Sequence, residues 1–282
     1  MIKWFWVYLA VILPASCAAV VDQYPTEAEA EFYDCHSTPQ WHVAEEALST
    51  LDLAGTESIL DIGCGSGKIT ANIAGRLTSG RIVGLDASQG MISYATSKYV
   101  PYYKNLSFVL GNALSLTHIN EYDLIVSFNS VHWMAPHEEL FTRVYDALMP
   151  GGRILFTSPC PADPKAARAL IDTISSSEWA PYFKTYKHPR SSLTLSRCTE
   201  LLAQIGFQDI EVMEQPFTHS FVNKSNVADW LAGFSAVLLF LPTDRQTEFL
   251  RQLVERYIHY FPLQLDGQVI YHQSELVIKA SK

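Results

Sequence analysis

Two aspartates and three glycines near residue 60 have the types and the spacing of a binding site. The segment ILDIGCGSGKIT carries Asp61 near the end of an apolar run and then places Gly63, Gly65 and Gly67 at alternate positions. Glycine lacks a Cβ atom, so the backbone there can turn sharply and can lie directly against a ligand. A second apolar run, RIVGLD, ends in Asp86, whose carboxylate could accept hydrogen bonds from both hydroxyl groups of a ribose. Glycines in a loop often serve turn geometry alone, but the second acid favours a site for a ligand that contains adenosine.

Alternating strands and helices are predicted around these residues. The expected strands are 58–62, 81–86, 106–113, 122–130 and 152–159, and the expected helices are 68–77, 88–98 and 138–148. This alternation favours a parallel sheet covered by helices on both faces. Ligands of such sheets bind outside the carboxyl ends of the strands, where both aspartates and the glycine loop fall.

After residue 159 the simple alternation ends. A helix at 199–205, a strand near 209–215 and a last strand near 271–280, antiparallel to it, are expected, with further helical spacing at 227–240 and 245–260. The predicted fold is therefore a doubly wound, Rossmann-like α/β sheet of seven mostly parallel strands, with an antiparallel last strand and a small helical cap. The aromatic and cationic stretch SEWAPYFKTYKHPR is expected to select the substrate, and FSAVLLFL is expected to be buried core.

Composition excludes several classes of partner. The formal charge of −9 and the absence of a Lys/Arg cluster argue against a nucleic-acid substrate. The five cysteines have no CxxC spacing, so neither a zinc site nor a disulfide framework is predicted, and no metal site is expected. The sequence leaves the oligomeric state open.

The loop pattern then discriminates between cofactors. Dinucleotide sites use G-x-G-x-x-G, whereas the pattern here is D-I-G-C-G-S-G, which resembles motif I of the class I S-adenosylmethionine (SAM) dependent methyltransferases. The segments GLDASQGMISYA, GNA, YDLIVSFNSVHWM and LMPGGRILF resemble the later motifs of that superfamily. The resemblance implies SAM as the cofactor. The cofactor-binding residues that it implies are Asp61, Gly63, Gly65, Gly67, Asp86, Ala87, Met91, Asn112, Ala113 and Asn129.

A narrower resemblance concerns the acceptor of the methyl group. The head YDCHSTPQWHVAEEAL, the segment SFNSVHWM and the tail YFPLQLDGQVIYHQSELVIKA resemble carboxyl O-methyltransferases, a group that includes the trans-aconitate, juvenile hormone acid and malonyl-carrier-protein enzymes. By this resemblance Gln40 and Trp133 hold the substrate carboxylate, and both side chains can donate an N–H. The ordinary alternative is that Trp133 is a core aromatic residue and Gln40 a surface helix residue. His132 is a weaker candidate and is more often structural than a base.

The predicted function is methylation of the carboxylate of a small-molecule or carrier-bound acid. One alternative is a methyltransferase that acts on an amine of a protein or nucleic acid. Enzymes that methylate nucleobase amines often carry an Asn/Asp-Pro-Pro-aromatic segment after the fourth strand, where this chain has Asn129, Ser130, Val131 and His132. The other alternative is a non-catalytic SAM-binding module.

The N-terminal segment differs in composition from the rest. After Lys3 there is no charged residue from Trp4 to Val21, and small residues at 15–19 precede an acidic stretch. Residues 1–21 are therefore expected to be a signal or an anchor, with membrane association through residues 4–21 and an exported or membrane-anchored location. SAM is made in the cytosol, so a cytoplasmic location, a start assigned too early and an apolar arm packed on the domain stay open. The methyltransferase domain is expected over 27–282, with cap elements within 160–192 and 225–262.

Overall fold

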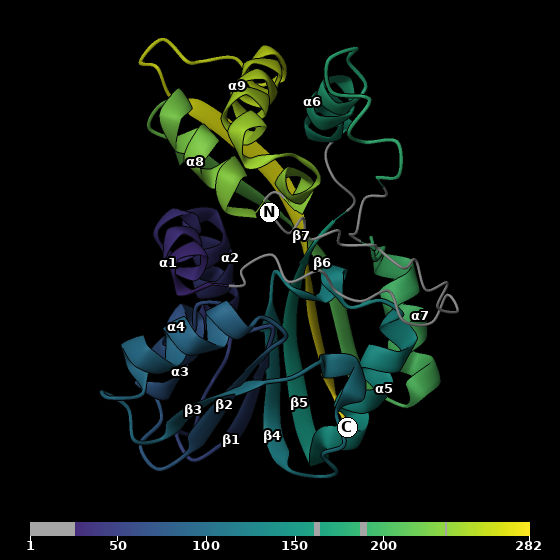
Figure 1. Ribbon diagram of the computed structural model, residues 1–282. Coiled ribbons are helices and arrows are strands. Elements are labelled where there is room, and N and C mark those ends of the chain that lie inside the picture. The colour runs from purple at the N-terminus through teal and green to yellow at the C-terminus, as the bar shows by residue number, and fades with distance from the viewer. Residues whose placement is uncertain (1–25, 161–163, 187–190, 235) are drawn as a thin grey trace, which may run out of the picture.

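The computed structural model describes residues 26–160, 164–186, 191–234 and 236–282 (Figure 1). The predicted signal or anchor segment, residues 1–21, therefore lies outside the described residues. None of the helices within the described ranges is long and apolar enough to cross a membrane.

A seven-stranded sheet forms the centre of the molecule, in the order β3-β2-β1-β4-β5-β7-β6. The first five strands are parallel, and β7 runs antiparallel to both β5 and β6. The strands are β1 Ser58–Ile62, β2 Arg81–Asp86, β3 Leu106–Leu110, β4 Tyr122–Phe128, β5 Leu148–Pro159, β6 Gln208–Phe221 and β7 Val269–Ser281. This topology confirms the predicted fold class, including the antiparallel last strand.

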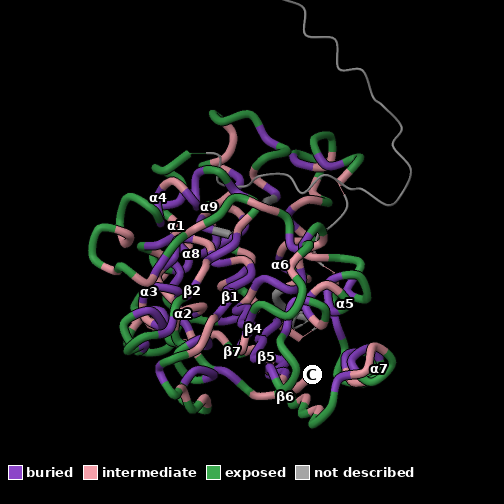
Figure 2. Tube along the Cα trace, turned by 90° about the horizontal axis from the view of Figure 1, so that it is seen from below, coloured by how far each residue is buried: buried purple, intermediate pink, exposed green. Residues whose placement is uncertain are grey.

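Helices cover both faces of the sheet, because the central strands are apolar on both sides. One face packs against α2 (Thr38–Ser49), α3 (Lys68–Ala74) and α4 (Gln89–Tyr99), around residues such as Ile59 and Leu124. The other face packs against α5 (His137–Ala147) and α7 (Leu195–Ile205), around Leu60 and Ile125. Figure 2 shows the result: the central strands are buried and the outer turns of the helices are exposed.

A helical layer lies beyond the carboxyl ends of the parallel strands (Figure 1). It contains α6 (Pro164–Ile174), α8 (Lys224–Phe234), the 3-10 helix η3 (Ala236–Phe240) and α9 (Thr243–Tyr260), which share one hydrophobic core. The strands β6 and β7 continue past the sheet into this layer, where Phe221 pairs with Val269. We call this layer the cap.

Several predicted boundaries and roles need correction. Helix α3 ends at Ala74 instead of residue 77, because Gly75 follows, and β6 extends from Gln208 to Phe221 instead of ending at 215. The stretch that begins SEWAPYF does not select a substrate through Trp179, which is fully buried in the cap core and packs edge-on against Phe249. The segment FSAVLLFL is core only in part, since Val237 is buried but Leu239 and Phe240 are exposed.

Helix α1 (Glu27–His36) begins at a capping box and lies over the carboxyl ends of the strands. The Thr26 side chain accepts a hydrogen bond from the Glu29 backbone N–H, and the Glu29 carboxylate accepts one from the Thr26 backbone. These reciprocal bonds satisfy backbone donors that the helix start would leave without partners. This capping box fixes the residue at which α1 begins.

Candidate active site

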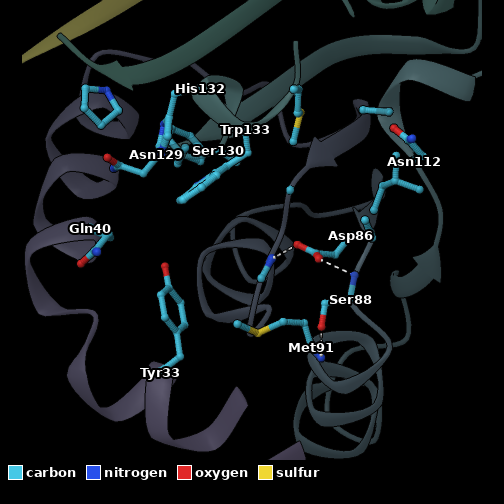
Figure 3. Close-up of a pocket in the computed structure, with 18 of the residues that line it drawn as sticks. Tyr33, Gln40, Asp86, Ser88, Met91, Asn112, Asn129, Ser130, His132 and Trp133 are labelled. Atoms are coloured by element: carbon cyan, nitrogen blue, oxygen red, sulfur yellow. Dashed lines mark hydrogen bonds between the residues drawn. The ribbon is translucent and has the colours of Figure 1, made fainter. Parts of the chain in front are cut away.

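A cavity of about 220 Å³ lies where the carboxyl ends of β1, β2 and β4 meet α1, α2 and the cap. Figure 3 shows its walls in close-up, with Tyr33 of α1, Gln40 of α2, Asp86 and Trp133 among the residues that surround it. Of the residues predicted from the sequence, the cavity is lined by Gln40, Gly63, Gly65, Asp86, Ala87, Met91, Asn112, Ala113, Asn129, His132 and Trp133.

The glycine loop after β1 forms one wall of the cavity, and Gly63 and Gly65 both line it. Gly63 has φ of +71°, and a Cβ there would stand 2.4 Å from Ser130 Oγ. Gly65 has φ of +53°, and a Cβ there would meet only the Tyr33 ring, at an ordinary contact distance of 3.8 Å. Both conformations favour glycine. A side chain at position 65 would fill the space between the loop and α1, so this glycine keeps a ligand cradle open.

Asp86 joins the glycine loop to the start of α4. Its Oδ2 accepts a hydrogen bond from the Gly65 backbone N–H at 2.8 Å, and its Oδ1 accepts one from the Ser88 N–H at 2.9 Å. The Ser88 hydroxyl in turn accepts from the Met91 N–H and caps α4. The carboxylate fixed in this way lies in the cavity wall, where the sequence motif predicts a ribose.

Asp61 and Gly67 are the two predicted cofactor residues that do not line the cavity. Asp61 is buried beneath the loop, and its Oδ2 accepts a hydrogen bond of 2.6 Å from the Thr70 hydroxyl. Burial, together with the negative charge of Asp86, raises the pKa of Asp61 to about 7, although the Thr70 bond opposes the rise. Gly67 begins α3 with φ of +79°, and a Cβ there would collide with Phe108 at 2.6 Å. The geometry gives both residues a role in shaping the loop.

The turn after β3 forms the far end of the cavity. Gly111, Asn112, Ala113 and Leu114 line it, and the Asn112 side-chain oxygen accepts a hydrogen bond from the Leu114 N–H. This bond caps the short 3-10 helix η1 (Ala113–Ser115) and holds the turn against the cavity. Most of the predicted cofactor residues thus line one side of the cavity, from the glycine loop through Asp86 to Asn112.

A different set of side chains lies across the cavity from Asp86 (Figure 3). Gln40 comes from α2, Asn129 follows β4, and His132 and Trp133 belong to the 3-10 helix η2 (Val131–Trp133). The His132 ring is buried, with its centroid 5.0 Å from the Trp133 ring. Among the described residues, neither the Gln40 side-chain oxygen nor the Asn129 side-chain nitrogen has a hydrogen-bond partner. This wall offers polar groups to a second ligand.

The structure adds lining residues that the sequence analysis missed. Trp230 of α8 and Tyr271 and Gln273 of β7 reach the cavity from the cap, with the Trp230 and Tyr271 rings 4.8 Å apart. Tyr33 and Ser88 also line it, and both lie within or beside quoted motifs. The described ranges contain no group of three or more His, Cys, Asp or Glu side chains placed to hold a metal ion. The described cysteines, Cys35, Cys64, Cys160 and Cys198, are free thiols.

Comparison with known proteins shows similarity to methyltransferases. Residues 59–152 match the family model described as a methyltransferase domain. The chain is 31% identical over 178 residues to trans-aconitate 2-methyltransferase from Streptomyces avermitilis, which covers 62% of this chain and 66% of the relative. It is 25% identical over 256 residues to the enzyme of the same name from Rhizobium meliloti, which covers 90% of this chain and 96% of the relative.

Solved structures share the fold. Phosphoethanolamine N-methyltransferase 2 from Haemonchus contortus, in complex with S-adenosyl-L-methionine, has a TM-score of 0.62 at 18% identity, over 96% of this chain and 61% of that one. The YcgJ protein from Bacillus subtilis has a TM-score of 0.60 at 19% identity, over 86% of this chain and 98% of that one.

Sheet topology, glycine loop and relatives together define the protein as a class I SAM-dependent methyltransferase. SAM is its cofactor, as the loop pattern predicts. Its similar curated relatives carry the name trans-aconitate 2-methyltransferase.

Proposed function

We propose that the protein transfers the methyl group of SAM to a carboxylate oxygen of a small-molecule or carrier-bound acid. The observation that carries the proposal is the pair of N–H-bearing side chains, Gln40 and Trp133, on the cavity wall across from Asp86. Neutral N–H donors suit a carboxylate, because they orient the anion without pairing it to a full positive charge. The names of the relatives support the same acceptor group.

The chemistry asks little of the protein beyond orientation. A carboxylate is ionised at neutral pH, so no general base has to remove a proton. Bound SAM supplies a methyl group on a positively charged sulfur. The carboxylate oxygen forms the new bond to that carbon as the carbon–sulfur bond breaks, and the products are a methyl ester and S-adenosylhomocysteine. Gln40 and Trp133 would hold the anion in line, while the cavity walls exclude water and raise the local attraction between opposite charges.

The lining of the cavity favours an acceptor with one carboxylate and an apolar body. Trp230 and Tyr271 supply apolar surface from the cap, and Met134, which follows η2, and Pro159, which ends β5, add more. The lining residues within the described part of the chain include no Lys or Arg. Trans-aconitate has three carboxylates, and each additional charge placed in this cavity would find no Lys or Arg among the described lining residues. A monocarboxylic acid with an aliphatic or aromatic body fits the described walls better.

The test is product analysis with labelled SAM and a panel of acceptors. We expect methyl esters of apolar monocarboxylic acids, identified by mass spectrometry, and much less transfer to tricarboxylates or to amines. Replacement of Gln40 by Ala should raise the KM for the acid while the Kd for SAM stays unchanged, because Gln40 lies across the cavity from Asp86. Transfer to an amine instead would overturn the proposal, and tight SAM binding with no transfer to any acceptor would favour a non-catalytic module.

A further inference from the structure

Asn129 has an unusual backbone conformation at the carboxyl end of β4. Its φ is +53°, a left-handed value that costs free energy in residues other than glycine and that Asn tolerates better than most. The conformation is fixed from the neighbouring strand, because the Asn129 N–H donates to both the carbonyl oxygen and the hydroxyl of Thr157, at 3.1 and 3.2 Å. Thr157 itself is fully buried in β5. The turn therefore fixes the backbone from which the Asn129 side chain projects.

The side chain presents a buried donor to the cavity. Asn129 lines the cavity, and its Nδ2 is buried without a hydrogen-bond partner among the described residues. A buried amide donor that stays without a partner destabilises the folded protein, because it has lost its hydrogen bonds to water. Its place in the cavity wall allows a ligand to supply the partner, and the position of the side chain indicates which ligand.

The neighbours of Asn129 are the residues proposed to bind the methyl acceptor. Figure 3 shows its amide on the same wall as Gln40, His132 and Trp133, across the cavity from Asp86. We propose that Asn129, which the sequence motif assigns to the cofactor, is a specificity-determining residue that donates a third hydrogen bond to the acceptor carboxylate. This assignment rests on the proposed function. Two carboxylate oxygens have about four lone-pair sites, enough for the amides of Gln40 and Asn129 and the indole of Trp133.

A second reading of Asn129 is conformational. Asn could occupy this position only because it tolerates a positive φ, with no role for its amide. The two readings differ in the effect of glycine, which adopts this φ freely and removes the amide. Under the conformational reading Asn129→Gly is harmless. Under our proposal it removes a donor without straining the backbone.

The experiment compares Asn129→Gly with a matched control. Asn120 also has φ of +53°, is exposed and accepts a hydrogen bond from Lys282 at the opposite end of the sheet, so Asn120→Gly reproduces the backbone change away from the cavity. For Asn129→Gly we expect the KM for the acid to rise at least tenfold and the Kd for SAM, measured by calorimetry, to stay within about twofold. Asn120→Gly should leave both unchanged.

A second variant tests the chemistry of the donor. Asn129→Asp keeps the size of the side chain and replaces the donor with an anion, so it should raise the KM for the acid more than Asn129→Gly does. A loss of SAM affinity in Asn129→Gly, or an unchanged KM for the acid, would overturn the role assigned to Asn129 but not the proposed function. A wild-type protein that methylates no acid would overturn the proposed function, and with it the assignment.

Discussion

At the scale of single residues, Asp86 is the side chain on which the cofactor wall depends most. Its two oxygens accept hydrogen bonds from the backbone N–H groups of Gly65 and Ser88, so it shapes the site in which we propose that it also binds a ribose. Hydrogen bonds to a charged group contribute about 1.5–3 kcal/mol each. We expect Asp86→Ala to raise the Kd for SAM at least tenfold in calorimetry. An unchanged Kd would show that Asp86 does not belong to the cofactor site. The Kd of Asp86→Asn, which keeps one acceptor oxygen, should lie between those of the wild type and Asp86→Ala.

The raised pKa of Asp61 predicts how the stability of the protein changes with pH. Burial raises its pKa to about 7, well above its usual value near 4 in an unfolded chain. The folded state therefore binds a proton more tightly than the unfolded state, so the contribution of Asp61 to the free energy of unfolding is largest below pH 4 and is lost as the pH rises to 7. The loss is on the order of 4 kcal/mol.

Asp61→Asn removes this titration while keeping an oxygen for the Thr70 hydroxyl. In urea unfolding, the stability of the variant relative to wild type should increase steadily from pH 4.5 to pH 7.5, values chosen to span roughly the range between the two pKa values. Parallel stability curves for the two proteins would show that Asp61 keeps an ordinary pKa.

At the scale of elements, helix α1 is tied to the glycine loop through one buried carboxylate. Asp34 accepts hydrogen bonds from the Ser66 hydroxyl at 2.6 Å, the Tyr94 hydroxyl at 3.2 Å and the Lys98 ammonium at 2.7 Å. Burial lowers the pKa of Lys98, but the bonds to Asp34 and Tyr94 outweigh it and raise that pKa above its usual value. Tyr33 precedes Asp34 in the chain and lines the cavity, so the contacts of Asp34 also position this part of the cavity wall.

We expect Asp34→Ala to destabilise the fold by about 1–3 kcal/mol, because the carboxylate holds three donors while half-exposed Lys98 can regain water. The Kd for SAM should rise as well, since α1 is no longer fastened to the glycine loop. Glu31→Ala changes an exposed carboxylate on the same helix and serves as the control. Equal SAM affinity in both variants would mean that α1 folds against the loop without Asp34.

Sequence pattern could predict the residues proposed to bind the cofactor better than the residues that line the cavity from the cap. The glycine loop, Asp86 and Asn112 lie within strand–turn–helix units, so their positions follow from local chain geometry. Trp230 and Tyr271 reach the cavity only because β6 and β7 extend beyond the sheet and α8 packs on them. Such packing joins residues about 40 positions apart, and neither periodicity nor turn chemistry encodes it. The burial of Trp179 in the cap core depends on the same kind of long-range packing, against Phe249.

At the scale of the whole molecule, we propose that the folded unit begins close to Glu27, where the capping box starts α1. A chain that begins at Val21 should then be soluble and bind SAM with the Kd of the full-length protein. The measurement is calorimetry on both proteins, with urea unfolding to compare their stability. An insoluble shortened chain, or one that has lost SAM affinity, would show that residues before Val21 belong to the fold.

The paired strands β6 and β7 have a consequence for how such proteins diversify. Except for Tyr33, Pro39 and Gln40, the lining residues up to Met134 come from the segment between the end of β1 and the start of α5. The later ones belong to other elements: Pro159 ends β5, Trp230 lies in α8, and Tyr271 and Gln273 lie in β7. The inner part of β7 is pinned to β5 from Arg153 to Pro159, while its outer part pairs with β6 alone. Insertions or recombination in the outer part can therefore reshape the end of the cavity that Tyr271 and Gln273 line without disturbing the register of the parallel strands, so the body of the substrate can vary while the chemistry stays constant.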